Sequence, residues 1–257
     1  MSDLEQKAIE RIKTASEMSF ALYKKPLVFT DSGGKDSAVI CKLAENAGIP
    51  FEIIHSHTTA DAPPTVYHVR KRAKMYEDKG IKYTILHPMY KGEQTSMWKL
   101  IPQKMIPPTR LARYCCQVLK EAHGRDRFIA TGVRWAESNS RANNRGVLEI
   151  EGSIKAKKIL LNNDNDEDRR LFESCQIKGK RVGCVGCPMA SKNRYSEFAR
   201  FPKFKQMYIN AFGRMLKVRK EQGKNDTTGL WTDAQAVFHW WMEDGVLPNQ
   251  IGFEDLG

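Results

Sequence analysis

A short glycine-containing stretch, residues 30–37 (Thr-Asp-Ser-Gly-Gly-Lys-Asp-Ser), constrains the fold of this chain more than any other feature. It follows an apolar run at residues 27–29 and precedes a run of helical character at residues 38–44. This order predicts a strand that leads through a tight loop into a helix. Adjacent glycines let the backbone approach a ligand closely, and the first N–H groups of a helix have no partner inside the helix. The stretch therefore predicts an anion-binding loop.

The charged residues of this loop suit a nucleotide phosphate. Lys35 adds a positive charge, and Asp36 can hold a magnesium ion that shares the phosphate charge. The ordinary P-loop is excluded because its glycines are separated and its lysine precedes serine or threonine, not aspartate. A Gly-Gly turn with incidental charges is the simplest alternative, and the strand and helix that flank the loop argue against it. The predicted nucleotide-binding residues of the loop are Ser32, Gly33, Gly34, Lys35, Asp36 and Ser37.

Length and polarity define the class of protein. The 257 residues, with 41% hydrophobic content, suffice for a full core, and the length predicts one α/β domain with an extension. No apolar run approaches the roughly 20 residues that span a bilayer, and the first residues are too polar to open a secretory signal. We therefore expect a cytoplasmic protein.

Charge and cysteine content indicate partners and chemistry. The formal net charge of +12 favours a polyanionic partner such as DNA or RNA, although a nucleotide substrate also favours a basic surface. Six cysteines in a chain of this class predict metal ligands or reactive thiols in preference to structural disulfides.

Alternation of strand and helix patterns predicts the fold. After an amphipathic helix that ends before Pro26, the strand at 27–29 is followed by a helix that stops at Gly48 and by a strand at 51–55. Strand, helix and strand in this order imply a right-handed parallel crossover. Further strands are predicted at residues 81–86 and 128–133. We expect a doubly wound, mainly parallel five-stranded sheet.

The second half of the chain predicts a different organisation. Residues 1–150 are expected to form the nucleotide-binding α/β domain, and residues 151–257 a cysteine-containing helical extension packed on it. Apolar residues at helical spacing over 204–215, and Asp233 before residues 234–242, predict two helices whose aromatic stripe is core. The polar tract at 162–168 lacks the glycine and glutamate of an EF-hand and predicts a loop.

Two other groups have structural or solvated roles in this interpretation. His55 and His57 alternate at the end of a strand, which favours packing or surface positions over catalysis. Residues 67–76 carry four positive charges on a predicted helix, where a solvated face is the default and contact with nucleic acid or substrate is the competing hypothesis.

Cysteines gather in two motifs. Cys115 and Cys116 are adjacent, with arginine before them and lysine after, a setting that stabilises thiolates. Cys184 and Cys187 form a C-x-x-C pair with small residues between them, which suits two thiolates that face one metal ion or cluster. Cys41 lies on an apolar helix face and is predicted to be core.

Three motifs occur together in one order: the Ser-Gly-Gly-Lys-Asp-Ser loop, Tyr-Cys-Cys-x-x-Leu-Lys at 114–120, and Gly-Val-Arg-x-x-Glu-Ser-x-x-Arg at 132–141. Together they resemble the phosphoadenosine phosphosulfate (PAPS) reductase-like family of the adenine nucleotide α-hydrolase (PP-loop) superfamily. The pattern is most similar to the sulfur-transfer subunit of DNA phosphorothioation systems. The resemblance implies binding of ATP with Mg²⁺ or of an adenylylated sulfate.

The resemblance also implies site residues. Five residues of the third motif would line the nucleotide or sulfur side of the pocket. Asp61, in the loop after the second strand, would help to bind the nucleotide. The residues implied for that lining are Gly132, Arg134, Glu137, Ser138 and Arg141. The catalytic set is predicted to be Lys35, Asp36, Arg134, Glu137 and Arg141.

Spacing alone leaves the metal open between zinc and an iron–sulfur cluster, and the resemblance favours a [4Fe–4S] cluster. Reductase-like members imply Cys115, Cys116, Cys184 and Cys187 as ligands. Phosphorothioation-like members imply Cys115, Cys175, Cys184 and Cys187. We favour Cys175 over Cys116, because adjacent cysteines on one helix strain a single cluster.

Absence of one motif decides between functions. The reductases carry a C-terminal Glu-Cys-Gly-Leu-His motif whose cysteine attacks sulfur, whereas this chain has no cysteine after Cys187. We therefore expect an ATP pyrophosphatase that activates an acceptor, such as nucleic acid, at the ATP α-phosphate for sulfur transfer. We also expect a cysteine desulfurase as the protein that donates sulfur, and association of the chain with copies of itself. The alternatives are a sulfonucleotide reductase and a non-catalytic, zinc-stabilised nucleic-acid-binding subunit.

Overall fold

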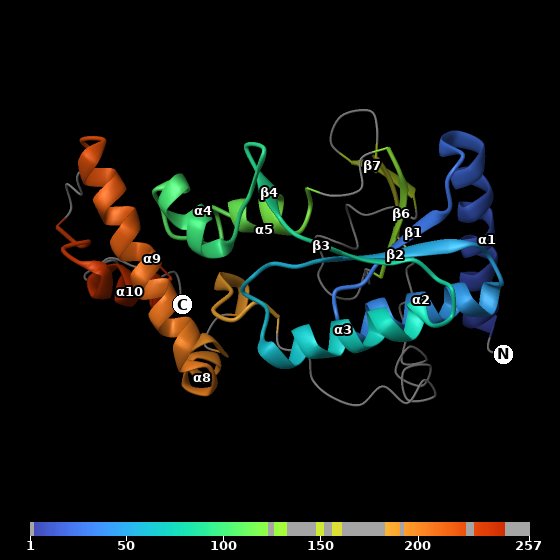
Figure 1. The fold of residues 1–257 in the computed structure, drawn as a ribbon, viewed down its shortest axis with the longest axis horizontal. Helices are drawn as coiled ribbons and strands as arrows, with labels where there is room; N and C mark the ends of the chain where they lie inside the picture. The colour runs from blue at the N-terminus through green and yellow to red at the C-terminus, as the bar shows by residue number, and fades with distance from the viewer. Residues whose placement is uncertain are drawn as a thin grey trace, which may run out of the picture. The chain divides into compact units, whose positions relative to one another are not determined.

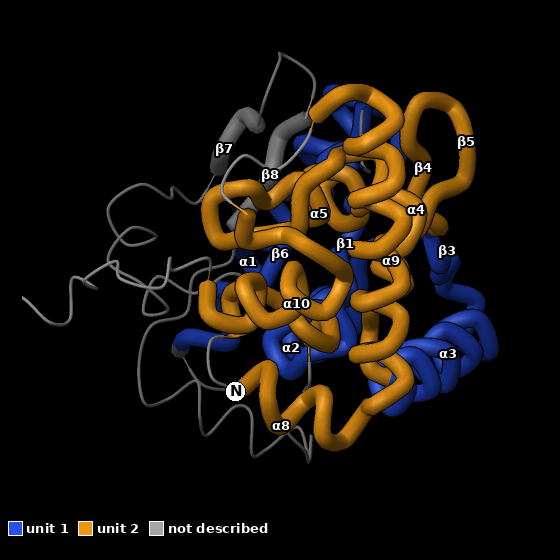
Figure 2. The backbone as a smooth tube through the Cα atoms, turned by 90° about the vertical axis from the view of Figure 1, so that its left-hand side faces the viewer, with its two compact units in different colours: residues 1–56, 63–86, 122–181 blue, residues 57–62, 87–121, 182–257 orange. Residues whose placement is uncertain are grey.

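The computed structural model describes residues 3–122, 126–132, 148–151, 156–160, 183–190, 193–224 and 229–244. The chain forms two compact units that interleave along the sequence (Figure 2). Unit 1 comprises Met1–Ser56, Pro63–Leu86 and Ala122–Arg181, and unit 2 comprises His57–Ala62, His87–Glu121 and Val182–Gly257. The domain boundary expected near residue 150 stays a prediction.

Unit 1 is built on a sheet with the strand order β3-β2-β1-β6-β8-β7. Its strands are β1 (Leu27–Thr30), β2 (Phe51–Ser56), β3 (Tyr83–Leu86), β6 (Phe128–Thr131), β7 (Leu148–Glu151) and β8 (Ala156–Leu160). The first five in spatial order pair in parallel, and β7 pairs antiparallel with β8. The α/β class with a mainly parallel sheet is confirmed. The described sheet has six strands, not the five expected, and the sequence located only β1, β2, β3 and β6 among them. It located neither β8 nor the antiparallel edge strand β7.

Three helices accompany this sheet: α1 (Asp3–Tyr23), α2 (Lys35–Ala47) and α3 (Pro63–Glu77). Figure 1 shows α2 and α3 on the same side of the sheet, as two successive right-handed crossovers require. α2 ends at Gly48, whose φ of 66° makes it a left-handed cap. The core of unit 1 includes Phe29 and Cys41, both fully buried, which confirms the core position predicted for Cys41.

Unit 2 is mainly helical. It contains α4 (Met97–Lys104), α5 (Tyr114–Leu119), α8 (Asn193–Arg200), α9 (Pro202–Glu221) and α10 (Ala234–Met242), with the short hairpin of β4 (Met89–Tyr90) and β5 (Glu93–Gln94). Asp233 accepts N–H hydrogen bonds from Gln235 and Ala236, so it caps α10 as predicted. The predicted aromatic stripe is core: Tyr208 and Phe212 are buried and pack against Trp241.

None of the described helices combines the length and the apolar character that crossing a membrane requires.

Candidate functional site

The loop between β1 and α2 has the backbone that the sequence predicts. Gly33 has a φ of 71°, in the left-handed region that favours glycine, and Gly34 is the N-cap of α2. A Cβ at Gly33 would lie 3.0 Å from methyl carbons of Thr65 and Val69, so side-chain space is also closed. Lys35 opens the helix and Asp36 lies in its first turn. We call residues 31–37 the phosphate loop.

The buried carboxylate of Asp31 accepts hydrogen bonds from the phosphate loop and fixes its conformation. Asp31, only 2% exposed, accepts the Gly33 N–H (2.8 Å) and the Ser37 hydroxyl (2.9 Å) on Oδ1. Its Oδ2 accepts the Tyr83 hydroxyl at 2.8 Å and lies 3.3 Å from Nε of Arg72. Both carboxylate oxygens are therefore satisfied, and the two ends of the turn are tied to one group.

Other contacts extend this network within unit 1. Nδ1 of His55 lies 2.7 Å from the Asp31 carbonyl oxygen, so His55 is a packed and not a surface residue. A Cβ at Gly132 would lie 3.0 Å from the Asp36 carbonyl oxygen, which explains why glycine stands where β6 ends beside the start of α2. Burial, and then the neighbouring Asp31, raise the pKa of Tyr83, so its hydroxyl stays a donor.

Sequence reasoning missed Asp31, Arg72 and Tyr83 as parts of the site. Arg72 was assigned to a solvated basic helix, yet it is only 7% exposed. Its position next to Ala73 and one helical turn before Tyr76, both buried, carried the signal, because it places Arg72 on the apolar face of α3.

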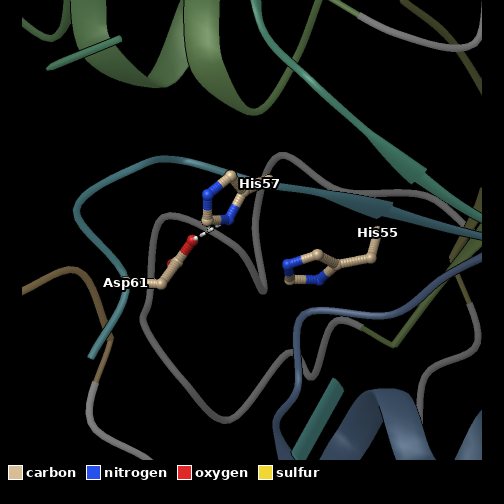
Figure 3. A group of neighbouring side chains, drawn as sticks. All are labelled: His55, His57 and Asp61. Carbon is tan, nitrogen blue, oxygen red and sulfur yellow. Dashed lines mark ion pairs between the residues drawn. The ribbon is translucent and has the colours of Figure 1, made fainter. Parts of the chain in front are cut away.

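Asp61 lies in unit 2, where its side chain contacts its own loop and its backbone pairs with Cys184. Its Oδ2 accepts the Thr58 N–H at 2.8 Å and lies 3.5 Å from Nδ1 of His57 (Figure 3). The nucleotide-seating role of Asp61 stays a prediction.

The C-x-x-C turn is fixed mainly by its backbone and by packing. Cys184 forms an antiparallel bridge with Asp61, and the Val185 N–H donates to the Ala60 carbonyl at 2.7 Å. The Gly186 N–H donates to Glu197 at 2.8 Å. Gly186 has a φ of 74°, and a Cβ there would lie 2.4 Å from the Phe198 ring. We call residues 184–187 the thiol loop.

Four predicted thiols belong to unit 2. Cys184 is buried, and Cys115 and Cys187 pack on the same core as Cys184. Their charges interact: hydrogen bonding with Cys116, burial, and the charges of Cys116, Cys184 and Cys187 raise the pKa of Cys115. Such a set of soft donors fits a zinc ion or an iron–sulfur cluster.

The two cysteines of α5 differ. A hydrogen bond with Cys115, aided by the Arg113 guanidinium 3.6 Å from Sγ, lowers the pKa of Cys116 to about 5, although burial opposes the shift. Burial raises the pKa of the Cys184 thiol, whose Sγ lies 3.3 Å from the Thr58 hydroxyl.

The remaining predicted residues lie outside the described residues. They are Arg134, Glu137, Ser138, Arg141 and Cys175, and the polar tract at 162–168 lies there as well. Their roles stay predictions.

Solved structures with similar folds include two with sulfur chemistry in their names. PAPS reductase from Candida auris is 19% identical, with a TM-score of 0.44, over 71% of this chain and 96% of that one. The U34-tRNA thiolase NcsA from Methanococcus maripaludis with its [4Fe–4S] cluster is 16% identical, with a TM-score of 0.49, over 96% and 91%.

Two further comparisons rest on the amino-acid sequence itself. An uncharacterised protein of Methanocaldococcus jannaschii is 28% identical over 249 residues, which cover 89% of this chain. The chain spans about half (56%) of the length of that relative. The family model of the phosphoadenosine phosphosulfate reductase domain matches residues 26–162, a segment that contains the phosphate loop and Cys115. The chain therefore belongs to the phosphoadenosine phosphosulfate reductase domain family.

Proposed function

We propose that this protein is a PP-loop ATP pyrophosphatase that activates an acceptor, a nucleic acid, for sulfur transfer. The observation that carries the proposal is the phosphate loop, a left-handed glycine turn braced by buried Asp31 and followed by Lys35 at the start of α2. A loop held in this way presents N–H groups and a positive charge to phosphate without reorganising. Membership of the PAPS reductase family supports an adenine nucleotide as the ligand.

The proposed reaction takes place at the α-phosphorus of ATP. An acceptor oxygen forms a bond to this phosphorus, and the bond from phosphorus to the bridging oxygen breaks, so pyrophosphate leaves with the electron pair. Lys35 and the loop N–H groups stabilise the charge that develops on pyrophosphate. Asp36 would hold Mg²⁺ beside the phosphates. Arg134, Glu137 and Arg141 are proposed to position the acceptor.

Cys115, Cys184 and Cys187, all in unit 2, are proposed to hold a [4Fe–4S] cluster, with either Cys175 or Cys116 as the fourth ligand. The donor chemistry fits, because thiolates are the usual ligands of such clusters and Cys184 lies in a dry, aromatic core. A bound cluster would supply a site for carrying or orienting sulfur. A cysteine desulfurase is the proposed source of that sulfur.

A sulfonucleotide reductase is the second candidate, and the family match supports it. That reaction needs a nucleophilic cysteine. Cys116 or Cys175 is proposed for that role in this candidate, and the one that takes it is then not a cluster ligand.

The test uses the full chain purified without oxygen. It is incubated with ATP and Mg²⁺, with bulk RNA or plasmid DNA as acceptor, and the phosphorus products are measured by ³¹P NMR. We expect pyrophosphate from the wild type and none from Lys35→Ala. Release of sulfite from PAPS, without pyrophosphate from ATP, would assign the reductase instead. Broad absorbance near about 400 nm in the same sample is expected for an iron–sulfur cluster and not for zinc.

A further inference from the structure

Helix α9 has two chemically distinct faces. One face packs into the core of unit 2 through Tyr208, Phe212, Met215 and their neighbours. The opposite face is exposed and basic, and it continues one turn past the helix end. Its basic residues, which we call the basic stripe, are Lys203, Arg214, Lys217, Lys220 and Lys224. The stripe follows α9, which is labelled in Figure 1. At about 1.5 Å per residue, this 20-residue helix is roughly 30 Å long.

The positive charge of the stripe is not compensated within the described chain. No described carboxylate lies within 4.0 Å of any of its five side chains. α9 has six basic residues and one acidic residue, Glu221. Two surface lysines of unit 1 do have such a partner, since Lys42 and Lys79 both pair with Glu45 at 2.7 Å. Like charges on successive turns of one helix repel, so the uncompensated stripe favours a polyanion.

Neutral polar groups accompany the stripe. Gln206 and Asn210 stand between its basic residues and are linked by a 2.9 Å hydrogen bond. Arg219 lies on the other side of α9, where its guanidinium donates to the Met105 carbonyl at 2.9 Å and lies 5.0 Å from the Trp231 ring centre. The stripe therefore offers a phosphate backbone exposed charges together with neutral hydrogen-bonding groups.

We propose that the basic stripe binds the phosphodiester backbone of a nucleic acid. A membrane surface does not fit, because the apolar face of α9 is buried in the core of unit 2. The inference rests on the proposed function only in making this nucleic acid the acceptor. Binding itself is a separate property.

Fluorescence anisotropy of the full chain tests the inference. The probes are labelled single-stranded RNA and DNA of about 20 nucleotides and the matching duplex, measured across roughly 50 to 200 mM salt. The variant combines Lys217→Glu, Lys220→Glu and Lys224→Glu. We expect single-strand affinity to fall by about tenfold or more and the salt slope to shrink by about 2, near 0.7 for each phosphate contact.

The matched control carries the same change in net charge on unit 1. It combines Arg70→Glu, Lys71→Glu and Lys74→Glu on the exposed face of α3 and should keep wild-type affinity within about twofold. Equal losses in the two variants, or a larger loss in the α3 variant, would overturn the inference.

Nucleotide binding separates this failure from failure of the proposed function. The stripe variant should keep the ATP affinity and melting temperature of the wild type. If the wild type binds oligonucleotide but not ATP, the proposed function fails and the stripe stands. If it binds ATP but no oligonucleotide, the inference about the basic stripe is wrong and the proposed nucleotide binding is unaffected.

Discussion

The phosphate loop of unit 1 and the thiol loop of unit 2 are both short glycine turns, but different forces hold them. The phosphate loop is organised by one buried charge, Asp31, which is bound by Arg72 and Tyr83. The thiol loop is organised by backbone pairing with Ala60 and by close packing of Gly186 on Phe198. One loop depends on electrostatics and the other on shape.

This difference suits the roles proposed for the two loops. A phosphate site needs its N–H groups held in place while they face a strongly hydrated anion, and a fixed buried carboxylate can orient them from the opposite side. A metal clamp needs its thiols at a set spacing, which a rigid backbone provides. Substitutions that remove charge should therefore damage the first loop, and substitutions that add volume should damage the second.

The largest effect is expected at Asp31. Asp31→Asn leaves the buried Arg72 guanidinium without its counter-charge, and breaking a buried pair of this kind costs about 3 to 5 kcal/mol. Urea unfolding measures the loss. Asp36→Asn is the control in the same loop, since Asp36 is only half-buried, and should cost less than about 1 kcal/mol. Equal losses in the free energy of unfolding would show that Asp31 does not stabilise the phosphate loop more than Asp36 does.

Gly186→Ala should come next. The added Cβ would lie 2.4 Å from the Phe198 ring on a backbone with a φ of 74°, so strain and overpacking together cost about 3 kcal/mol. Gly223→Ala has a similar φ of 66° with no atom within 4 Å, so only the backbone cost of about 1 kcal/mol applies. If the two variants unfold at the same urea concentration, packing does not define the thiol loop.

Tyr83→Phe should have the smallest effect of the three. It removes one hydrogen bond to a charged carboxylate while Arg72, Ser37 and the Gly33 N–H remain, which predicts a loss of about 1.5 kcal/mol. ATP affinity, followed by calorimetry, should fall with it by a few fold. Unchanged stability together with unchanged affinity would remove Tyr83 from the network.

The strands, helices and motifs were easier to predict from the sequence than the side chains that hold the loops in place. Strand, loop and helix around residue 33 were predictable because local patterns specify them. Cys184 and Cys187 could be identified as candidate metal ligands from their C-x-x-C spacing. Asp31 was not, because its importance depends on Tyr83, which β3 brings to it from 52 positions away. Strand β7 was missed for a related reason, since an antiparallel edge strand leaves only a short, unperiodic signal.

The account assigns nucleotide binding to the phosphate loop and metal binding to the thiol loop, and one titration tests that division directly. ATP affinity in the presence of Mg²⁺ is measured by calorimetry on anaerobically purified wild type, Lys35→Ala and Cys187→Ser. The account predicts that Lys35→Ala weakens ATP binding at least about tenfold, the effect of losing a charge-assisted phosphate contact, whereas Cys187→Ser stays within about twofold of the wild type. Equal weakening in both variants, or none in Lys35→Ala, would contradict it.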